Sequence, residues 1–134
     1  MPVIPPVPAD VKPVGSTVRL KKGVAGETLS QGDACYLLEN KWMKADNSTS
    51  AKADFKIIAM SQALVDEEFT YVEEGEVDLG ASFTEDEVYV LSSTSGQFEP
   101  IADLSSNDYI TIAGIGNASN NLILKPWATG KQHA

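Results

Sequence analysis

Residues 34–45 read ACYLLENKWMKA. An apolar run from Ala34 to Leu38 leads into the polar turn Glu39-Asn40-Lys41, and the run 42–45 leads back. Two β-prone runs joined by a short polar turn are typical of an antiparallel hairpin. We therefore predict a β-hairpin here and read the rest of the chain outward from it.

The same alternation of short apolar runs and turns continues on both sides of this hairpin. Gly, Ser, Asn and Asp residues separate the runs at intervals of about 8–12 residues, the spacing of a sandwich or barrel. Only residues 46–54 offer a helical start, as a short turn. The pattern predicts a mainly β chain whose further strands lie at 17–22, 55–63, 69–71 and 77–79 (joined by a hairpin turn at Glu74-Gly75), 88–91, 97–101, 109–115 and 122–124.

The segment 1–15 is distinct because it holds five of the seven prolines. Proline fixes φ and removes an amide donor, so the segment favours the extended polyproline II form. An extended apolar arm can lie on another protein or fold back on its own domain, and both readings stay open. The residues expected to make the contact are Pro2, Val3, Ile4, Pro5, Pro6, Val7, Pro8 and Val11.

These features predict three parts of the chain. Residues 1–15 form the extended arm and residues 16–127 a compact β-barrel-like domain. Residues 128–134 follow Pro126 without an anchoring pattern, so we expect a flexible tail there. We also expect removal of residues 1–14 to leave the domain folded, with little change in melting temperature.

The balance of charged residues indicates which kinds of partner the chain can bind. Ten Lys and Arg face 19 Asp and Glu, for a formal net charge of -9. Nucleic acids and anionic membrane surfaces both need clustered basic residues, so neither is an expected partner. The sequence has neither an apolar run of about 20 residues nor the basic start of a signal peptide. We therefore expect synthesis in the cytoplasm.

The residue types that carry chemistry are sparse. His133 is the only histidine and lies in the expected tail. Cys35 is the only cysteine and lies in an apolar run, where we expect it to be buried. Nucleophilic catalysis needs an imidazole held beside its nucleophile. Acidic residues gather in 66–68, 73–78 and 85–87, where solvated charge at strand ends is expected. We expect no catalytic residue, no metal site and no cofactor, and hence no enzyme.

The two tryptophans, Trp42 and Trp127, could stack on a sugar. We expect instead that Trp42 packs in the core and that Trp127 docks onto the domain.

Three stretches of sequence, in this order, resemble the head decoration (capsid cement) proteins of tailed phages. Together with the strands between them they cover about residues 17–126. The stretches are Gly26-Glu27-Thr28-Leu29 with Gly32-Asp33-Ala34-Cys35-Tyr36; Val88 to Gly96 with Pro100-Ile101-Ala102-Asp103-Leu104; and Ile115-Gly116-Asn117-Ala118 with Asn121-Leu122-Ile123-Leu124-Lys125-Pro126.

This resemblance implies a compact β-barrel or β-tulip-like domain that forms homotrimers. It implies a place on the capsid exterior of the virion, where the protein clamps neighbouring subunits of the major capsid protein, with the N-terminal arm as a contact. The family has no catalytic residues. The alternative is a phage head-fibre or receptor-binding module that recognises glycans, for which Trp42 with Tyr36 is the candidate exposed pair.

Overall fold

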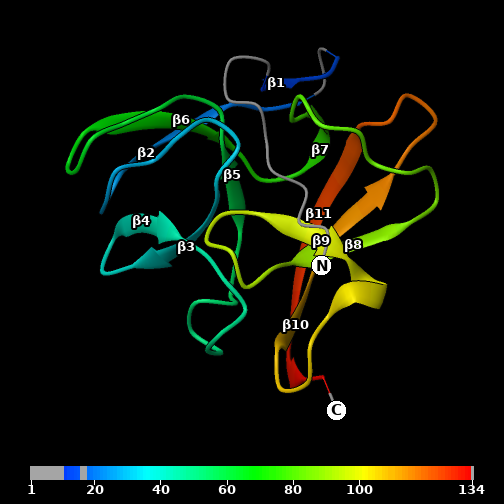
Figure 1. The fold of residues 1–134 in the computed structure, drawn as a ribbon. Helices are drawn as coiled ribbons and strands as arrows, with labels where there is room; N and C mark the ends of the chain where they lie inside the picture. Colours follow the sequence, from blue (N-terminus) through cyan, green and yellow to red (C-terminus); the bar gives the residue numbers. More distant parts are fainter. Residues whose placement is uncertain (1–10, 16–17, 134) are drawn as a thin grey trace.

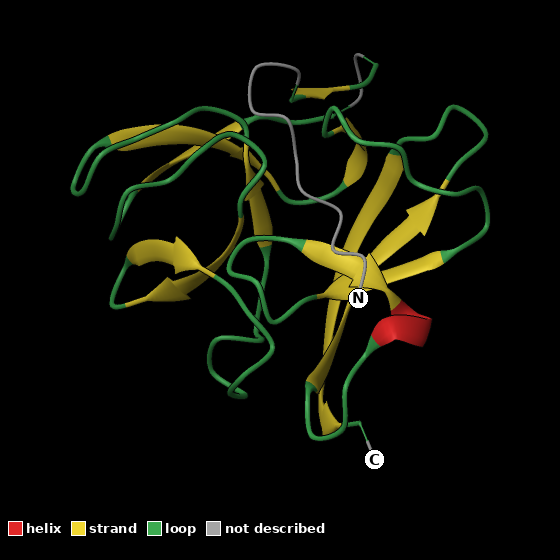
Figure 2. Cartoon of the chain, in the orientation of Figure 1, coloured by secondary structure: helices red, strands yellow, loops and turns green. Residues whose placement is uncertain are grey.

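The computed structural model describes residues 11–15 and 18–133 of the chain. It is mainly β, with two antiparallel sheets (Figures 1 and 2). Sheet A has the strand order β1 (Lys12–Pro13), β7 (Gly75–Asp78), β11 (Leu122–Gln132), β10 (Tyr109–Gly116), β8 (Val88–Leu91) and β9 (Phe98–Pro100). Sheet B has the order β2 (Lys21–Val24), β6 (Glu68–Val72), β5 (Ile57–Ala59), β3 (Ala34–Leu38) and β4 (Lys41–Lys44). A short 3-10 helix, η2 (Ile101–Asp103), follows β9.

The hairpin predicted from residues 34–45 is confirmed as β3 and β4, which pair in register from Cys35–Lys44 to Leu38–Lys41. Glu39 and Asn40 make the turn with φ of 50° and 70°. A two-residue turn with both central φ values positive matches the right-handed twist of the strands it joins.

Sheet B curls until its two edges meet. Ala25, just after β2, forms a parallel bridge with Trp42 of β4, and the Gly26 N–H donates to the Trp42 carbonyl at 2.8 Å. A Cβ on Gly23 would come within 2.6 Å of Trp42 Nε1, so the close approach requires glycine. The curled sheet encloses its own apolar cluster, which includes Leu29, Cys35, Trp42, Ile57 and Phe69.

A second and larger apolar cluster joins the two sheets. Phe55 and Ile58, from the sheet B side, share it with Tyr89, Leu91 and Phe98 of sheet A. The Phe55 and Phe98 rings lie 5.4 Å apart. Aromatic pairs at this distance add to the stabilisation from burial, so the two sheets fold around one shared core.

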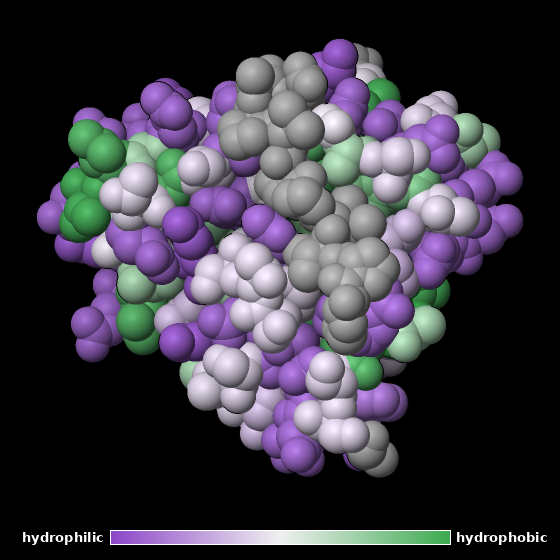
Figure 3. Space-filling model, viewed as in Figure 1, coloured by the Kyte–Doolittle hydropathy of each residue, from purple (hydrophilic) through white to green (hydrophobic). Residues whose placement is uncertain are grey.

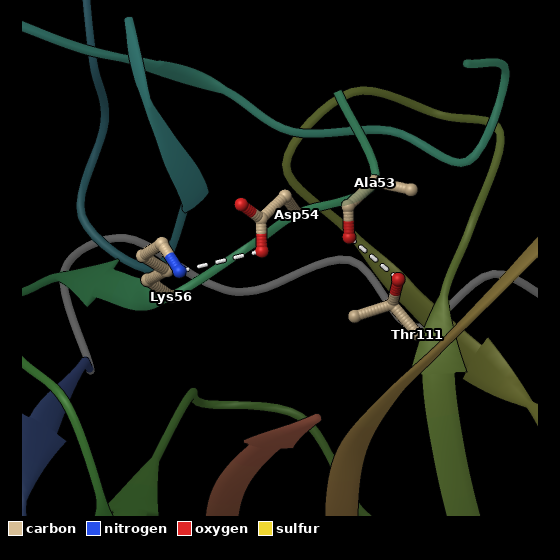
Figure 4. A network of polar contacts seen from close by, with 4 residues as sticks. All are labelled: Ala53, Asp54, Lys56 and Thr111. Atoms are coloured by element: carbon tan, nitrogen blue, oxygen red, sulfur yellow. Dashed lines mark hydrogen bonds and ion pairs between the residues drawn. The ribbon is translucent and has the colours of Figure 1, made fainter. Parts of the chain in front are cut away.

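Polar contacts from the loop between β4 and β5 fasten it to sheet A. The Thr111 hydroxyl of β10 donates to the Ala53 carbonyl (Figure 4). The Asn47 side-chain amide donates to the Leu91 carbonyl at 3.1 Å, and the Asn47 carbonyl accepts from the Tyr109 N–H at 3.0 Å. The Lys56–Asp54 pair in Figure 4, at 3.4 Å, is about half exposed and contributes little by comparison.

One predicted connection is wrong, and one predicted strand is shorter than expected. Residues 69–79 do not form a hairpin, because β6 lies in sheet B and β7 in sheet A. The turn at Glu73 and Glu74 instead carries the chain from one sheet to the other. The run 55–63 gives a strand only at Ile57–Ala59, although Phe55 and Met60 beside it are also buried.

The C-terminal boundary also differs from the prediction. Strand β11 does not stop at Pro126 but continues to Gln132, paired with β10 through Ala128–Thr111 and Gln132–Tyr109. Figure 1 shows β10 and β11 running together past β8 toward the C-terminus. Residues 128–132 are therefore part of sheet A and not a separate tail, because β10 is long enough to pair with them.

Candidate interaction surfaces

Most of the predicted arm contacts, Pro2 to Pro8, lie outside the described residues. Val11 is described, and only 8% of its surface is exposed because it belongs to the core shared by the sheets. Lys12 and Pro13 pair with Asp78 and Val77 of β7, and the Val14 N–H donates to the Glu76 carbonyl at 2.9 Å. Val11 is therefore not free to contact a partner, which corrects the prediction for that residue.

The Cys35 thiol is sealed in the curled sheet. It has no exposed surface, and its S–H donates to the Asp33 carbonyl at 3.4 Å. Burial raises its pKa well above the usual value, with Asp33 adding to the effect. Since the thiolate is the reactive form, this thiol is inert, and the prediction that it is buried is confirmed.

His133 is better anchored than the predicted loose tail allows. Its N–H donates to the Asp108 carbonyl and its carbonyl accepts from the Asn107 N–H, both at 2.7 Å. Its side chain is exposed. The backbone of His133 is thus held against the loop before β10, while its imidazole is exposed.

The acidic segments lie at the surface. Glu76 accepts hydrogen bonds from the side-chain amides of Asn121 and Asn117, at 2.9 Å each, and these bonds lower its pKa. Others pair with lysines, as in Lys21–Glu73 and Lys22–Glu68. Across residues 11–15 and 18–133, no three His, Cys, Asp or Glu side chains are grouped so that they could hold a metal ion.

The most deeply buried of the described acids is Glu99 on the edge strand β9. Its surface is 1% exposed, and its Oε1 has no hydrogen-bond partner among the described residues. Burial, together with the nearby charges of Asp108 and Asp103, raises its pKa to about 7. Sequence reasoning missed it, because an acidic residue between Phe98 and Pro100 gives no local sign that it is buried.

The two tryptophans have opposite surroundings. Trp42 is buried as predicted, with its ring 5.3 Å from that of Tyr71, and Tyr36 is buried too. Trp42 with Tyr36 is therefore not an exposed pair. Trp127 is 65% exposed and does not dock onto the domain, which contradicts the prediction.

Trp127 lies at an apolar groove on sheet A. The groove has a volume of about 550 Å³ and runs over β8, β10 and β11. Its apolar side chains are direct cross-strand neighbours, since Ile115 pairs with both Val88 and Ile123, and Ile112 pairs with Trp127. We call this surface the sheet A groove; it is lined by Val88, Ile112, Gly114, Ile115, Ile123, Lys125, Pro126 and Trp127.

A second apolar surface lies at one end of sheet B, where three turns meet. Lys41 forms an ion pair with Asp66, and the Asp66 N–H donates to the Ala25 carbonyl at 2.8 Å. Figure 3 shows groups of hydrophobic atoms at the left of the view, with hydrophilic atoms between them. We call it the sheet B tip; its side chains, 37–61% exposed, are Val24, Leu37, Leu38, Leu64 and Val65.

Both surfaces have a partial signal in the sequence. Strand β10 carries apolar residues on both of its faces, as Ile112 and Ala113 show, which indicates that its outer face is not simply solvated. The doublets Leu37-Leu38 and Leu64-Val65 beside polar turns are similar signals.

Comparison of the chain with family models, with curated proteins and with solved structures finds no match. Within the described residues, no helix is long and apolar enough to cross a bilayer.

Proposed function

We propose that this chain is a structural virion protein that binds the outside of a tailed-phage capsid and stabilises contacts between major capsid subunits. The order of the three sequence stretches supports the phage assignment. In this proposal the fold is of the β-barrel or β-tulip-like kind, which the curling of sheet B favours. The protein forms a homotrimer and acts on the capsid exterior after synthesis in the host cytoplasm.

The sheet B tip is the observation that carries a binding role. Leu64 and Val65 are 61% and 54% exposed, and Leu37 and Leu38 are each nearly half exposed. Large apolar side chains that gather at one surface and are rimmed by charge mark a protein interface more often than a solvated surface. The rim here is the Lys41–Asp66 and Lys22–Glu68 pairs.

The proposal includes no enzymatic activity, metal or cofactor. The sealed thiol of Cys35 supports this, because a nucleophile has to reach its substrate.

A glycan-binding head-fibre or receptor module is the second candidate. Trp127, 65% exposed at the edge of a groove, favours it, because an exposed aromatic ring can stack on a sugar. Burial of Trp42 and Tyr36 removes the pair that sequence reasoning suggested.

Co-sedimentation with expanded capsids of the phage that encodes the chain tests the first candidate. We expect saturable, stoichiometric binding that weakens at least tenfold in the double variant Leu38→Asp/Leu64→Asp. Ala118→Asp, at an exposed loop position in the β10–β11 connection, is the control and should bind normally. Absence of capsid binding would overturn the proposal, and binding to host cells instead would support the second candidate.

A further inference from the structure

The sheet A groove is built to receive an apolar segment. Ile112, Ile115 and Ile123 line it, and Trp127 and Pro126 stand beside them. A Cβ on Gly114 would fall 1.9 Å from the Ile123 carbonyl oxygen, so β10 and β11 approach closely at this point. Lys125 is the one charged residue among the lining residues.

The strand edge next to the groove is poorly suited to pairing with another strand. Beyond Leu124, β7 no longer pairs with β11, and no other described strand takes its place. This edge carries Lys125, Pro126, Gly130 with φ of 72°, and Lys131. Lysine and proline, together with backbone irregularities such as the one at Gly130, protect a sheet edge from the addition of another strand. A ligand of the groove therefore contributes side chains more than backbone pairing.

An extended proline-rich segment meets this requirement, because polyproline II ligands dock in aromatic-lined grooves with little loss of conformational freedom. This chain carries such a segment in residues 2–8, PVIPPVP. We propose that the sheet A groove of one copy binds residues 2–8 of a second copy, with Val3, Ile4 and Val7 facing the groove.

The position of Val11 favours a second copy over the same chain. Val11 packs in the shared core with Tyr89 and Leu122, whereas their strand neighbours Val88 and Ile123 line the groove. Successive strand residues face opposite sides of a sheet, so Val11 and the groove lie on opposite faces of sheet A. A stiff proline-rich segment would have to reverse around the sheet edge to reach its own groove.

A contact between an arm and a groove is heterologous, and such contacts close into rings, including trimers, when the rotation between copies allows it. The inference thus rests on the homotrimer part of the proposed function. It does not depend on capsid binding.

Light scattering of the full-length chain tests it. We expect the wild type to associate, and Trp127→Ala and the arm variant Val3→Asp/Ile4→Asp each to self-associate at least tenfold more weakly. Leu20→Ala is the matched control, since Leu20 is 52% exposed and belongs to neither the sheet A groove nor the sheet B tip. Circular dichroism checks that each variant is folded, and the arm variant still decides the question if Trp127→Ala does not fold.

Mixing the two weakened variants gives the sharper test. Val3→Asp/Ile4→Asp retains an intact groove, and Trp127→Ala retains an intact arm. The mixture should therefore form a two-chain species that neither variant forms by itself. A monomeric wild type, an arm variant that associates normally, or a mixture that stays monomeric would each overturn the inference. Capsid co-sedimentation of the same variants is scored separately, so failure here is distinguishable from failure of the proposed function.

Discussion

At the scale of single residues, Glu99 is the group whose surroundings fit its charge least. Its carboxyl group is buried on the edge strand β9, with one oxygen unpartnered among the described residues. The cost of burying an unpaired charge is avoided by binding a proton. That is the physical reason why burial, Asp108 and Asp103 raise its pKa to about 7.

We predict that Glu99→Gln raises stability at pH 8 and has little effect at pH 4. An unfolded Glu titrates near 4.3, so the folded state binds the extra proton between about pH 4 and 7 and loses stability as pH rises through that window. The gain at pH 8 should be on the order of 1–3 kcal/mol, since one pKa unit corresponds to about 1.4 kcal/mol. Urea unfolding at both pH values measures it. Glu85→Gln, at an exposed position, is the control, and an equal effect at both pH values would contradict the prediction.

Gly114 is the second residue whose identity the packing dictates. We predict that Gly114→Ala destabilises the protein by about 2–4 kcal/mol, because the new Cβ would force β10 away from the Ile123 carbonyl. Gly130→Ala is the matched control. Gly130 has φ of 72° but open space around it, so only the backbone cost of about 1–2 kcal/mol applies. Equal losses in the two variants, measured by thermal unfolding, would count against the close-contact explanation.

At the scale of elements, β11 decides how the chain ends. Its last residues pair with β10, and the Thr129 hydroxyl donates to the Ile110 carbonyl at 2.7 Å. Backbone bonds between His133 and residues Asn107 and Asp108 then close the loop that precedes β10. The segment therefore supports the loop as well as the strand.

We predict that deleting residues 129–134 lowers the free energy of unfolding by about 1.5–4.5 kcal/mol. Each lost hydrogen bond contributes about 0.5–1.5 kcal/mol net, and three of those described above are removed. Chemical denaturation measures the loss. Lys131→Ala, which trims an exposed side chain and keeps the strand, should be nearly neutral. An unchanged stability after the deletion would restore the reading of these residues as a loose tail.

At the scale of the whole molecule, the N-terminal boundary of the domain falls within the predicted arm. Val11 fills the shared core, and residues 12–14 extend sheet A beside β7. The packing of Val11 argues against the expectation that removing residues 1–14 changes the melting temperature little, because that deletion removes a core side chain.

We predict that a chain beginning at Gly15 is less stable than one beginning at Val11 by about 2–4 kcal/mol. Burial of one valine contributes about 1.5–3 kcal/mol, and the Val14–Glu76 hydrogen bond adds to it. Urea unfolding of the two truncated proteins provides the comparison. Equal stabilities would show that β1 adds nothing to the core.

Local pattern was enough to predict the class of fold and several strands. The hairpin of β3 and β4 follows from apolar alternation around Glu39-Asn40, and β8 appears at the predicted residues, 88–91. The buried states of Cys35 and Trp42 also follow from their place in apolar runs. These features depend on neighbours a few residues apart, which the sequence lists directly.

Tertiary structure decided the rest. The turn after β6 resembles a hairpin turn in the sequence, yet it joins two different sheets. Strand β7 pairs with a partner far along the chain, as Val77 does with Leu122. Burial of Glu99 and Val11 and exposure of Trp127 likewise depend on which surfaces the sheets cover. A residue's type limits the environments it tolerates, but its environment is set by chain segments that are distant in sequence and meet only in the folded molecule.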